Sequence, residues 1–130
     1  MQNEIIKKEL VDKIEGLIKS ARKNVAIYVN SALLVTYMEI GKAMAEEGLL
    51  QKWGEDESKG SLRSLSKTLT KKYGKGFSVG NLRNMIMFYK TYGSVQTLSE
   101  HLSWSHYCEL ILITNSDKRH FYEKECEISR

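Results

Sequence analysis

Apolar residues recur at steps of three and four along the first third of the chain. The series is Ile6, Leu10, Ile14, Leu17 or Ile18, Ala21, Val25, Val29, Ala32 or Leu33, Thr36, Ile40 and Met44. This spacing places its members on one face of a helix, and Gly48 is the first clear stop signal. The pattern therefore predicts a helical arm over residues 1–48, which as a single helix would be roughly 60 Å long.

The apolar series thins between Gly16 and Asn24, where polar and basic residues interrupt it. Helices of this length commonly bend or pack against another chain. We therefore expect two consecutive helices or one bent helix, with the break in this stretch. Dimerisation through the apolar face is a further hypothesis.

The middle of the chain predicts two shorter helices joined by a turn over residues 74–77. Their apolar residues again step by three and four: Leu62, Leu65, Leu69 and Tyr73 in the first, and Leu82, Met85, Ile86 and Tyr89 in the second. Ser61 and Ser78 are the expected N-caps, and Gly74 and Gly93 are the expected ends. The pair resembles a helix-turn-helix within residues 58–93.

Two more helices are predicted in residues 94–130. Ser103 is the expected N-cap of one, and Ser116 that of the last, while residues 94–102 fit either a short helix or an extended connector. The last helix continues to Arg130 without a stop signal, as in the N-terminal part of a longer protein.

The chain contains no proline, which fits an all-α fold. At 130 residues and 42% hydrophobic content, we expect one domain, 1–130.

Charge is distributed very unevenly along the sequence. Residues 58–99 contain eight Lys or Arg and no Asp or Glu. Of the 20 basic and 16 acidic residues in the chain, 12 basic and 16 acidic remain elsewhere, so the segment is +8 and the rest is −4. A basic helix-turn-helix on an acidic scaffold indicates a surface that binds nucleic acid.

The candidate DNA-binding residues follow from this segment. Basic side chains would neutralise phosphates, Ser78 would donate to a phosphate at a helix N-terminus, and asparagines near the start of the second helix would read adenine edges. The set is Lys67, Lys71, Lys72, Lys75, Ser78, Asn81, Arg83, Asn84 and Lys90. We expect double-stranded DNA as partner, with phosphate contacts supplying most of the affinity.

Two other interpretations remain open. The basic face would be ordinary solvated surface if the chain is a protein-interaction module that dimerises through its N-terminal helical face. Alternatively, aromatic residues near the basic segment would stack on unpaired RNA bases: Tyr73, Phe77, Tyr89 and Tyr92.

Catalytic and metal-binding motifs are not apparent in the sequence. His106 and Cys108 are two residues apart on a predicted helix and so lie on different faces, which does not suit a zinc site. Ser103, Ser105 and His106 lack a nucleophile elbow, and we expect no enzyme activity and no cofactor in this chain. Two cysteines and no signal peptide or membrane-spanning run favour a reducing cytoplasmic location.

Five short segments resemble one known family. They are 37–42 (YMEIGK), 65–69 (LSKTL), 73–78 (YGKGFS), 81–85 (NLRNM) with Phe88 and Tyr89, and 102–107 (LSWSHY). In order and spacing they are similar to the N-terminal domain of YhcG-like bacterial proteins, from about residue 10 to 130. The resemblance implies a helical domain thought to bind DNA, followed by a PD-(D/E)XK nuclease-like domain that these 130 residues do not include.

The chain departs from the family pattern at three positions. Met38 stands where the family favours Trp, Ile86 replaces a usual Arg, and Gly80 occupies a position that is often basic. The last two lie on the predicted second helix of the pair. The absence of these two positive charges either weakens the DNA-binding interpretation or moves the expected contacts to Lys67, Lys71, Lys72 and Lys75. The second helix would then contact the DNA backbone more than it recognises bases.

Overall fold

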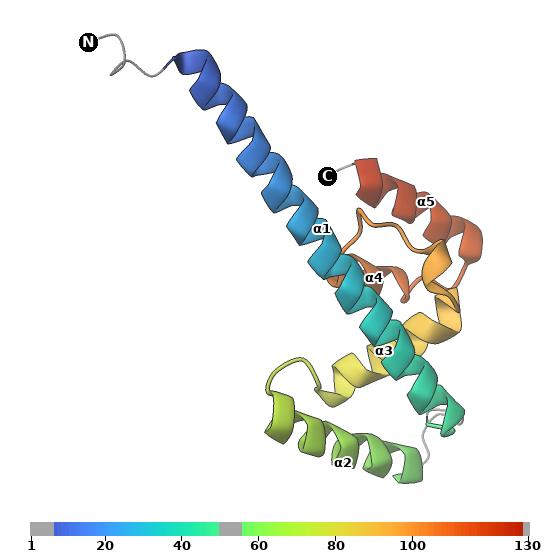
Figure 1. Ribbon diagram of the computed structural model, residues 1–130. Coiled ribbons are helices and arrows are strands. Elements are labelled where there is room, and N and C mark those ends of the chain that lie inside the picture. The colour runs from blue at the N-terminus through green and yellow to red at the C-terminus, as the bar shows by residue number, and fades with distance from the viewer. Residues whose placement is uncertain (1–6, 50–55, 129–130) are drawn as a thin grey trace.

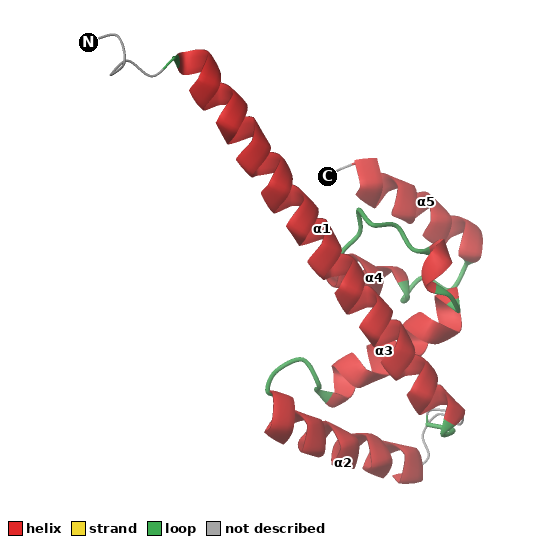
Figure 2. Cartoon of the chain, viewed as in Figure 1, coloured by secondary structure: helices red, strands yellow, loops and turns green. Residues whose placement is uncertain are grey.

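The computed structural model describes residues 7–49 and 56–128, with side chains from residue 62 onward in the second range. Within these ranges the protein has five α-helices, one short 3₁₀ helix and no strand (Figure 2). They are α1 (Lys8–Glu46), α2 (Asp56–Tyr73), α3 (Val79–Tyr92), η2 (Val95–Thr97), α4 (Trp104–Leu110) and α5 (Ser116–Ile128). The predicted all-α fold is confirmed.

Helix α1 is continuous over 39 residues, or roughly 58 Å. The break expected between Gly16 and Asn24 is absent, so the single long helix is the correct alternative. Polar residues thin the apolar stripe there but are compatible with helix, because this segment packs against nothing in the described chain. Every side chain from Lys8 to Ala26 is exposed, and Figure 1 shows this half of α1 projecting away from the other helices.

The other helices gather around the C-terminal half of α1, and α3 crosses it at the centre of the domain (Figure 1). The two helices touch at Gly41, where the missing side chain lets the α3 backbone approach. The face of α1 turned toward the domain carries Leu34, Met38 and Met44, all nearly inaccessible to solvent. Met44 belongs to the predicted apolar series, whereas Leu34 and Met38 do not.

Two apolar clusters form the core, one on each side of this crossing. The first contains Leu34, Met38, Phe88, Leu102, Tyr107, Leu110 and Ile111. The second contains Met44, Leu62, Leu82, Met85 and Ile86. Tyr37 and Trp104 pack against both clusters, with ring centroids 4.7 Å apart. Helix α3 contributes to both, so it is the central helix of the core.

Most of the predicted helix boundaries are confirmed, including Gly74, which follows the last residue of α2 with φ of 83°. The Ser78 hydroxyl accepts the Asn81 N–H at the start of α3, and Gly93 ends that helix with φ of 71°. Ser103 caps α4 in a reciprocal arrangement in which its N–H donates to His106 Nδ1 over 3.0 Å. The undecided stretch 94–102 contains only the short helix η2.

Two predicted N-caps are wrong. Ser61 lies inside α2, which begins five residues earlier at Asp56. Ser116 is the first residue of α5, and Asn115 caps this helix by accepting the Lys118 N–H over 2.9 Å. In both cases the N-cap lies earlier in the sequence than the serine that the pattern favours.

Candidate nucleic-acid interface

A row of basic side chains follows the solvent face of α2. Arg63, Lys67 and Lys71 are spaced by four residues, so they lie on one side of the helix about 6 Å apart along its axis. All three are exposed, while Leu62 on the other side is fully buried in the core. Lys75 follows in the turn and is also exposed. We call these four residues the basic row.

The basic row has no acidic neighbour in sequence and no ion pair with the described residues. Residues 58–99 contain no Asp or Glu, so the acidic residues of α2 are confined to Asp56 and Glu57 at its start. Lys72 is exposed as well, but lies roughly 100° around the helix from Lys71. Arg63 is absent from the predicted set, although its four-residue spacing from Lys67 is the signal that identifies it.

Hydrogen bonds hold the turn between α2 and α3 against both helices. Gly74 and Gly76 have positive φ values of 83° and 107°, which glycine adopts without strain. The Ser66 hydroxyl in α2 donates to the Phe77 carbonyl over 2.6 Å. Ser78, at the end of the turn, is exposed and keeps its own hydroxyl proton for an external acceptor. The position of Lys75 relative to α2 is therefore fixed by this turn.

Asn81 connects the turn to α4. Its Nδ2 donates to the Gly76 carbonyl over 2.6 Å, and its Oδ1 accepts the Trp104 indole N–H over 2.9 Å. Both ends of the amide thus have partners inside the domain. These two bonds fix the amide inside the domain, so the side chain has a structural role in this conformation.

Helix α3 is largely covered. Among its residues only Gly80 and Lys90 are exposed, whereas Arg83 and Asn84 are partly buried. Asn84 directs its amide toward Cys108 Sγ, 3.5 Å away, and burial raises the pKa of this thiol while the Asn84 contact lowers it. Ile86, at the position where the resembling family has Arg, is fully buried. The predicted site residues thus separate into an exposed group on α2 and the following turn and a partly buried group on α3, with Lys90 exposed near the end of α3.

Most of the aromatic residues considered for base stacking are structural. The Tyr92 hydroxyl donates to Glu123 Oε1 over 2.7 Å, and its ring contacts those of Phe88 and Tyr107. Burial, followed by the Glu123 carboxylate, raises the Tyr92 pKa. Tyr73 is different, since 70% of it is exposed at the end of α2; it lies on the side of Leu69, and its ring centroid is 6.2 Å from that of Phe77. Of the four aromatic candidates it is the most available to a ligand.

Ser103 and His106 lie close together for a structural reason. Nδ1 of His106 accepts the Ser103 backbone N–H and is 3.1 Å from the Ser103 hydroxyl, while that hydroxyl accepts the His106 N–H. These bonds form the N-cap of α4. In the part of the chain that the structure describes, no three His, Cys, Asp or Glu residues are grouped closely enough to hold a metal ion.

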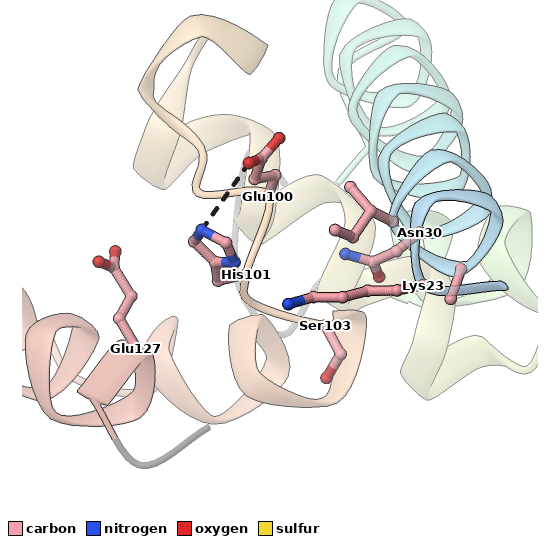
Figure 3. A pocket seen from close by; sticks show the side chains of 8 residues that line it. Lys23, Asn30, Glu100, His101, Ser103 and Glu127 are labelled. Carbon is pink, nitrogen blue, oxygen red and sulfur yellow. Dashed lines mark ion pairs between the residues drawn. The ribbon is translucent and has the colours of Figure 1, made fainter. Parts of the chain in front are cut away.

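A cavity of about 490 Å³ lies away from the basic row, between α1 and residues 100–127 (Figure 3). In Figure 3 Lys23 extends from α1 across this space, and Glu127 stands on the opposite side. His101 is 3.7 Å from Glu100. Because carboxylates and only one lysine line it, the cavity does not suit a phosphate group. No helix within the described ranges combines the length and hydropathy that crossing a membrane requires.

The structure thus defines a small all-α domain with a long projecting helix and a basic helix packed beside its core. Comparison with known families identifies it further: residues 13–130 match the DUF1016 N-terminal domain, and the chain belongs to that family. It is also 31% identical to an Escherichia coli (strain K12) protein named "Putative nuclease YhcG", over 90% of this chain. The resemblance expected from the sequence is confirmed.

The chain spans 40% of the length of this relative. No solved structure matches the chain. Over the matched part, the family assignment describes a domain that accompanies a nuclease, and no catalytic domain is recognised in these residues.

Proposed function

We propose that this chain is a DNA-binding domain that positions a nuclease domain on duplex DNA. The observation that carries the proposal is the basic row on α2, exposed and without acidic neighbours from residue 58 to residue 99. The name of the relative adds support, because a nuclease must engage nucleic acid. The cytoplasm, where DNA and free thiols such as Cys108 coexist in bacteria, is the location that we propose.

Phosphate contacts supply the affinity in this proposal, and base reading contributes little. The exposed cations stand on α2 and the following turn, whereas the amide of Asn81 is occupied and α3 is covered. Four cations that neutralise four phosphates give a slope of about −3.6 for log K against log salt. In this proposal the partly buried side chains of α3, Arg83 and Asn84, hold the helix in place. The exposed Lys90 contacts DNA at the edge of the interface.

Fluorescence anisotropy with a short labelled duplex, titrated at several salt concentrations, tests the proposal. Replacing Lys67 and Lys71 by Gln is expected to reduce the salt slope by about 2 and to weaken binding to all sequences alike. Replacing Lys118 and Lys124 by Gln on α5 removes the same net charge at exposed positions and serves as the matched control. Equal losses in both variants, or no binding at low salt, would refute the α2 interface.

An RNA-binding function is a second candidate, favoured by the exposed Tyr73 in the last turn of α2. Stacking of a base on an aromatic side chain contributes about 1–3 kcal/mol. The same titration with single-stranded RNA at equal salt separates the two functions. Preference for the duplex, with Tyr73→Ala unchanged, supports DNA; preference for the single strand that Tyr73→Ala abolishes supports RNA.

A protein-interaction module is the third candidate, favoured by the exposed apolar residues of α1. Leu17, Val25 and Tyr28 are each more than half exposed. This function does not exclude DNA binding, since the two surfaces lie on different helices.

A further inference from the structure

An uninterrupted heptad pattern runs along an exposed face of α1. Apolar residues occupy every a and d position over 25 residues, with steps that alternate between three and four: Val11, Ile14, Ile18, Ala21, Val25, Tyr28, Ala32 and Val35. All of them are exposed. The next a and d positions are Glu39 and Lys42, so charged residues end the stripe. Heptads sustained over this length are typical of coiled coils.

The rest of the domain occupies the other side of α1. Ile27, Leu34 and Gly41, which face the domain, recur every seven residues at position c. Position c is roughly 160° around the helix from position a. Position d is about 100° from position c, and Val35, the last d residue, lines a small hollow with Val95 and Leu98 of the domain. From Val11 to Val25 the stripe is clear of the domain, so a second helix fits on it there.

We propose that α1 pairs with α1 of a second copy in a parallel two-stranded coiled coil over residues 11–35. Residues Val11, Ile18 and Val25 occupy position a, where parallel dimers favour β-branched side chains. In a parallel pair each of these residues meets its own counterpart. The stripe is thus complementary to itself, which makes a second copy the occupant that suits it.

The charges beside the stripe favour the parallel orientation. Glu15 and Arg22 are at position e, and in a parallel pair they lie next to Leu10 and Leu17 at position g of the other helix. No like charges meet in this arrangement. A fully overlapped antiparallel pair would instead bring Arg22 beside its counterpart in the second copy, with two positive charges in contact.

The size of the seam also suits a dimer. Four a, four d, three e and four g positions lie between residues 10 and 35, which makes 15 residues from each chain. A standard interface covers about 800 Å² with 20–30 residues a side, so this seam covers roughly 500 Å² per chain and roughly 1,000 Å² in total. This area is at the lower end for a specific interface. We therefore expect a dimer that dissociates in the micromolar range.

Sedimentation velocity of the 130-residue chain across the micromolar range tests the association directly. The mass is expected to rise from 15.0 kDa toward twice this value with concentration. Replacing Ile18 and Val25 by Lys places charge at two a positions and is expected to keep the chain monomeric. Replacing Gly16 and Ser20 by Lys, at exposed f and c positions of the same segment, adds the same charge and is expected to leave the dimer intact.

A chain that stays monomeric throughout, or two double variants that associate equally, would overturn the proposal. Orientation is tested separately with Ile18→Cys, which a parallel dimer brings within disulfide distance of its counterpart. We expect a cross-linked dimer on mild oxidation, and none from Ser20→Cys or from the parent chain with Cys108 and Cys126 alone. A dimer that Ile18→Cys fails to cross-link would overturn the parallel arrangement. None of these measurements involves DNA, so their outcome is independent of the proposed function.

Discussion

Gly41 of α1 lies directly against Met85 of α3, so that a Cβ atom at residue 41 would overlap the Met85 carbonyl oxygen. The same Cβ would be 3.2 Å from Cβ of Tyr89. Backbone atoms of a helix have no rotamer with which to move away. The two helices therefore cross at this distance only because residue 41 has no side chain, and both core clusters depend on α3 remaining there.

Gly41→Ala is therefore expected to destabilise the domain, although alanine is the better helix former. The added methyl group forces α1 and α3 apart and loosens the packing of Met85 and its neighbours. Overpacking of this kind costs roughly 3 kcal/mol. Urea unfolding followed by circular dichroism measures the loss, and an unchanged midpoint would show that the crossing is not held at this glycine.

Gly16→Ala is the matched control in the same helix, with the opposite expected sign. A Cβ atom at Gly16 would meet nothing within 4 Å. Glycine in a helix interior is less favourable than alanine by about 0.8–1.0 kcal/mol. The variant is expected to raise the helical signal of the projecting arm and leave the unfolding of the core unchanged. A loss of helicity would mean that residue 16 has a partner not present in the single chain.

Asn81→Ala separates a structural from a base-reading role. The substitution removes the acceptor for the Trp104 N–H and the donor to the Gly76 carbonyl, and we expect a loss of about 2 kcal/mol in unfolding free energy. Duplexes of different sequence are expected to lose affinity equally. If stability is unchanged while discrimination among sequences disappears, Asn81 reads bases and its internal bonds are exchanged on binding.

Stability at alkaline pH is expected to depend on Tyr107. Burial raises the pKa of this phenol from 10.0 to about 12, although the Ser99 N–H that its oxygen accepts acts in the lowering direction. The folded state therefore holds the proton more tightly than the unfolded chain does. The contribution of Tyr107 to the free energy of unfolding is therefore complete below pH 10 and is lost as the pH rises from 10 to 12.

Urea midpoints measured across this pH range test the prediction. Tyr107→Phe is expected to be less stable at neutral pH, because the Ser99 N–H loses its acceptor, but to show a smaller decline above pH 10. Tyr92 contributes in the same direction, since burial and Glu123 also raise its pKa. Identical alkaline declines in the parent and in Tyr107→Phe would contradict the assignment to Tyr107.

Local sequence signals predicted the positions of the helices well, but they predicted less well which face of each helix packs against the others. Ser78, Gly93 and Ser103 are caps in the structure as they are in the pattern, because capping depends on the nearest few residues. The face of α1 that packs on the domain followed the pattern only in part: Met44 is a member of the apolar series, whereas Leu34 and Met38 are not. It includes Gly41 and the amide of Asn30, which donates to the Leu102 carbonyl 72 residues away. Gly41 has no side chain and Asn30 has a polar one, so the spacing of apolar residues does not reveal either of them.

The candidate site shows the same division. The basic row follows from composition and the four-residue spacing of Arg63, Lys67 and Lys71, which are exposed as a charged helix face should be. The contacts of Asn81 could not be foreseen, because its partner Trp104 lies 23 residues further along the chain. The sequence alone does not distinguish an asparagine that faces the DNA major groove from one that is bonded to a tryptophan of the same domain.

The two proposals together predict that DNA affinity depends on duplex length. A parallel dimer holds both copies of α2 toward the same end of the coil, because α2 follows the C-terminal end of α1 (Figure 1). Once one basic row is bound, the second binds the same duplex as an intramolecular event, which raises affinity by about 100-fold or more. A duplex too short to reach both rows gains nothing.

The monomeric variant with Lys at residues 18 and 25 is expected to bind a short duplex as the parent does, or slightly more tightly because it carries two added positive charges. On a long duplex it is expected to lose the bivalent gain. Anisotropy with the two duplexes at one salt concentration measures this difference, and the variant with Lys at residues 16 and 20 corrects for the added charge. Parallel losses on short and long duplexes would mean that α1 itself contacts DNA. Equal affinity of parent and variant on the long duplex would mean that the two basic rows cannot reach one duplex together.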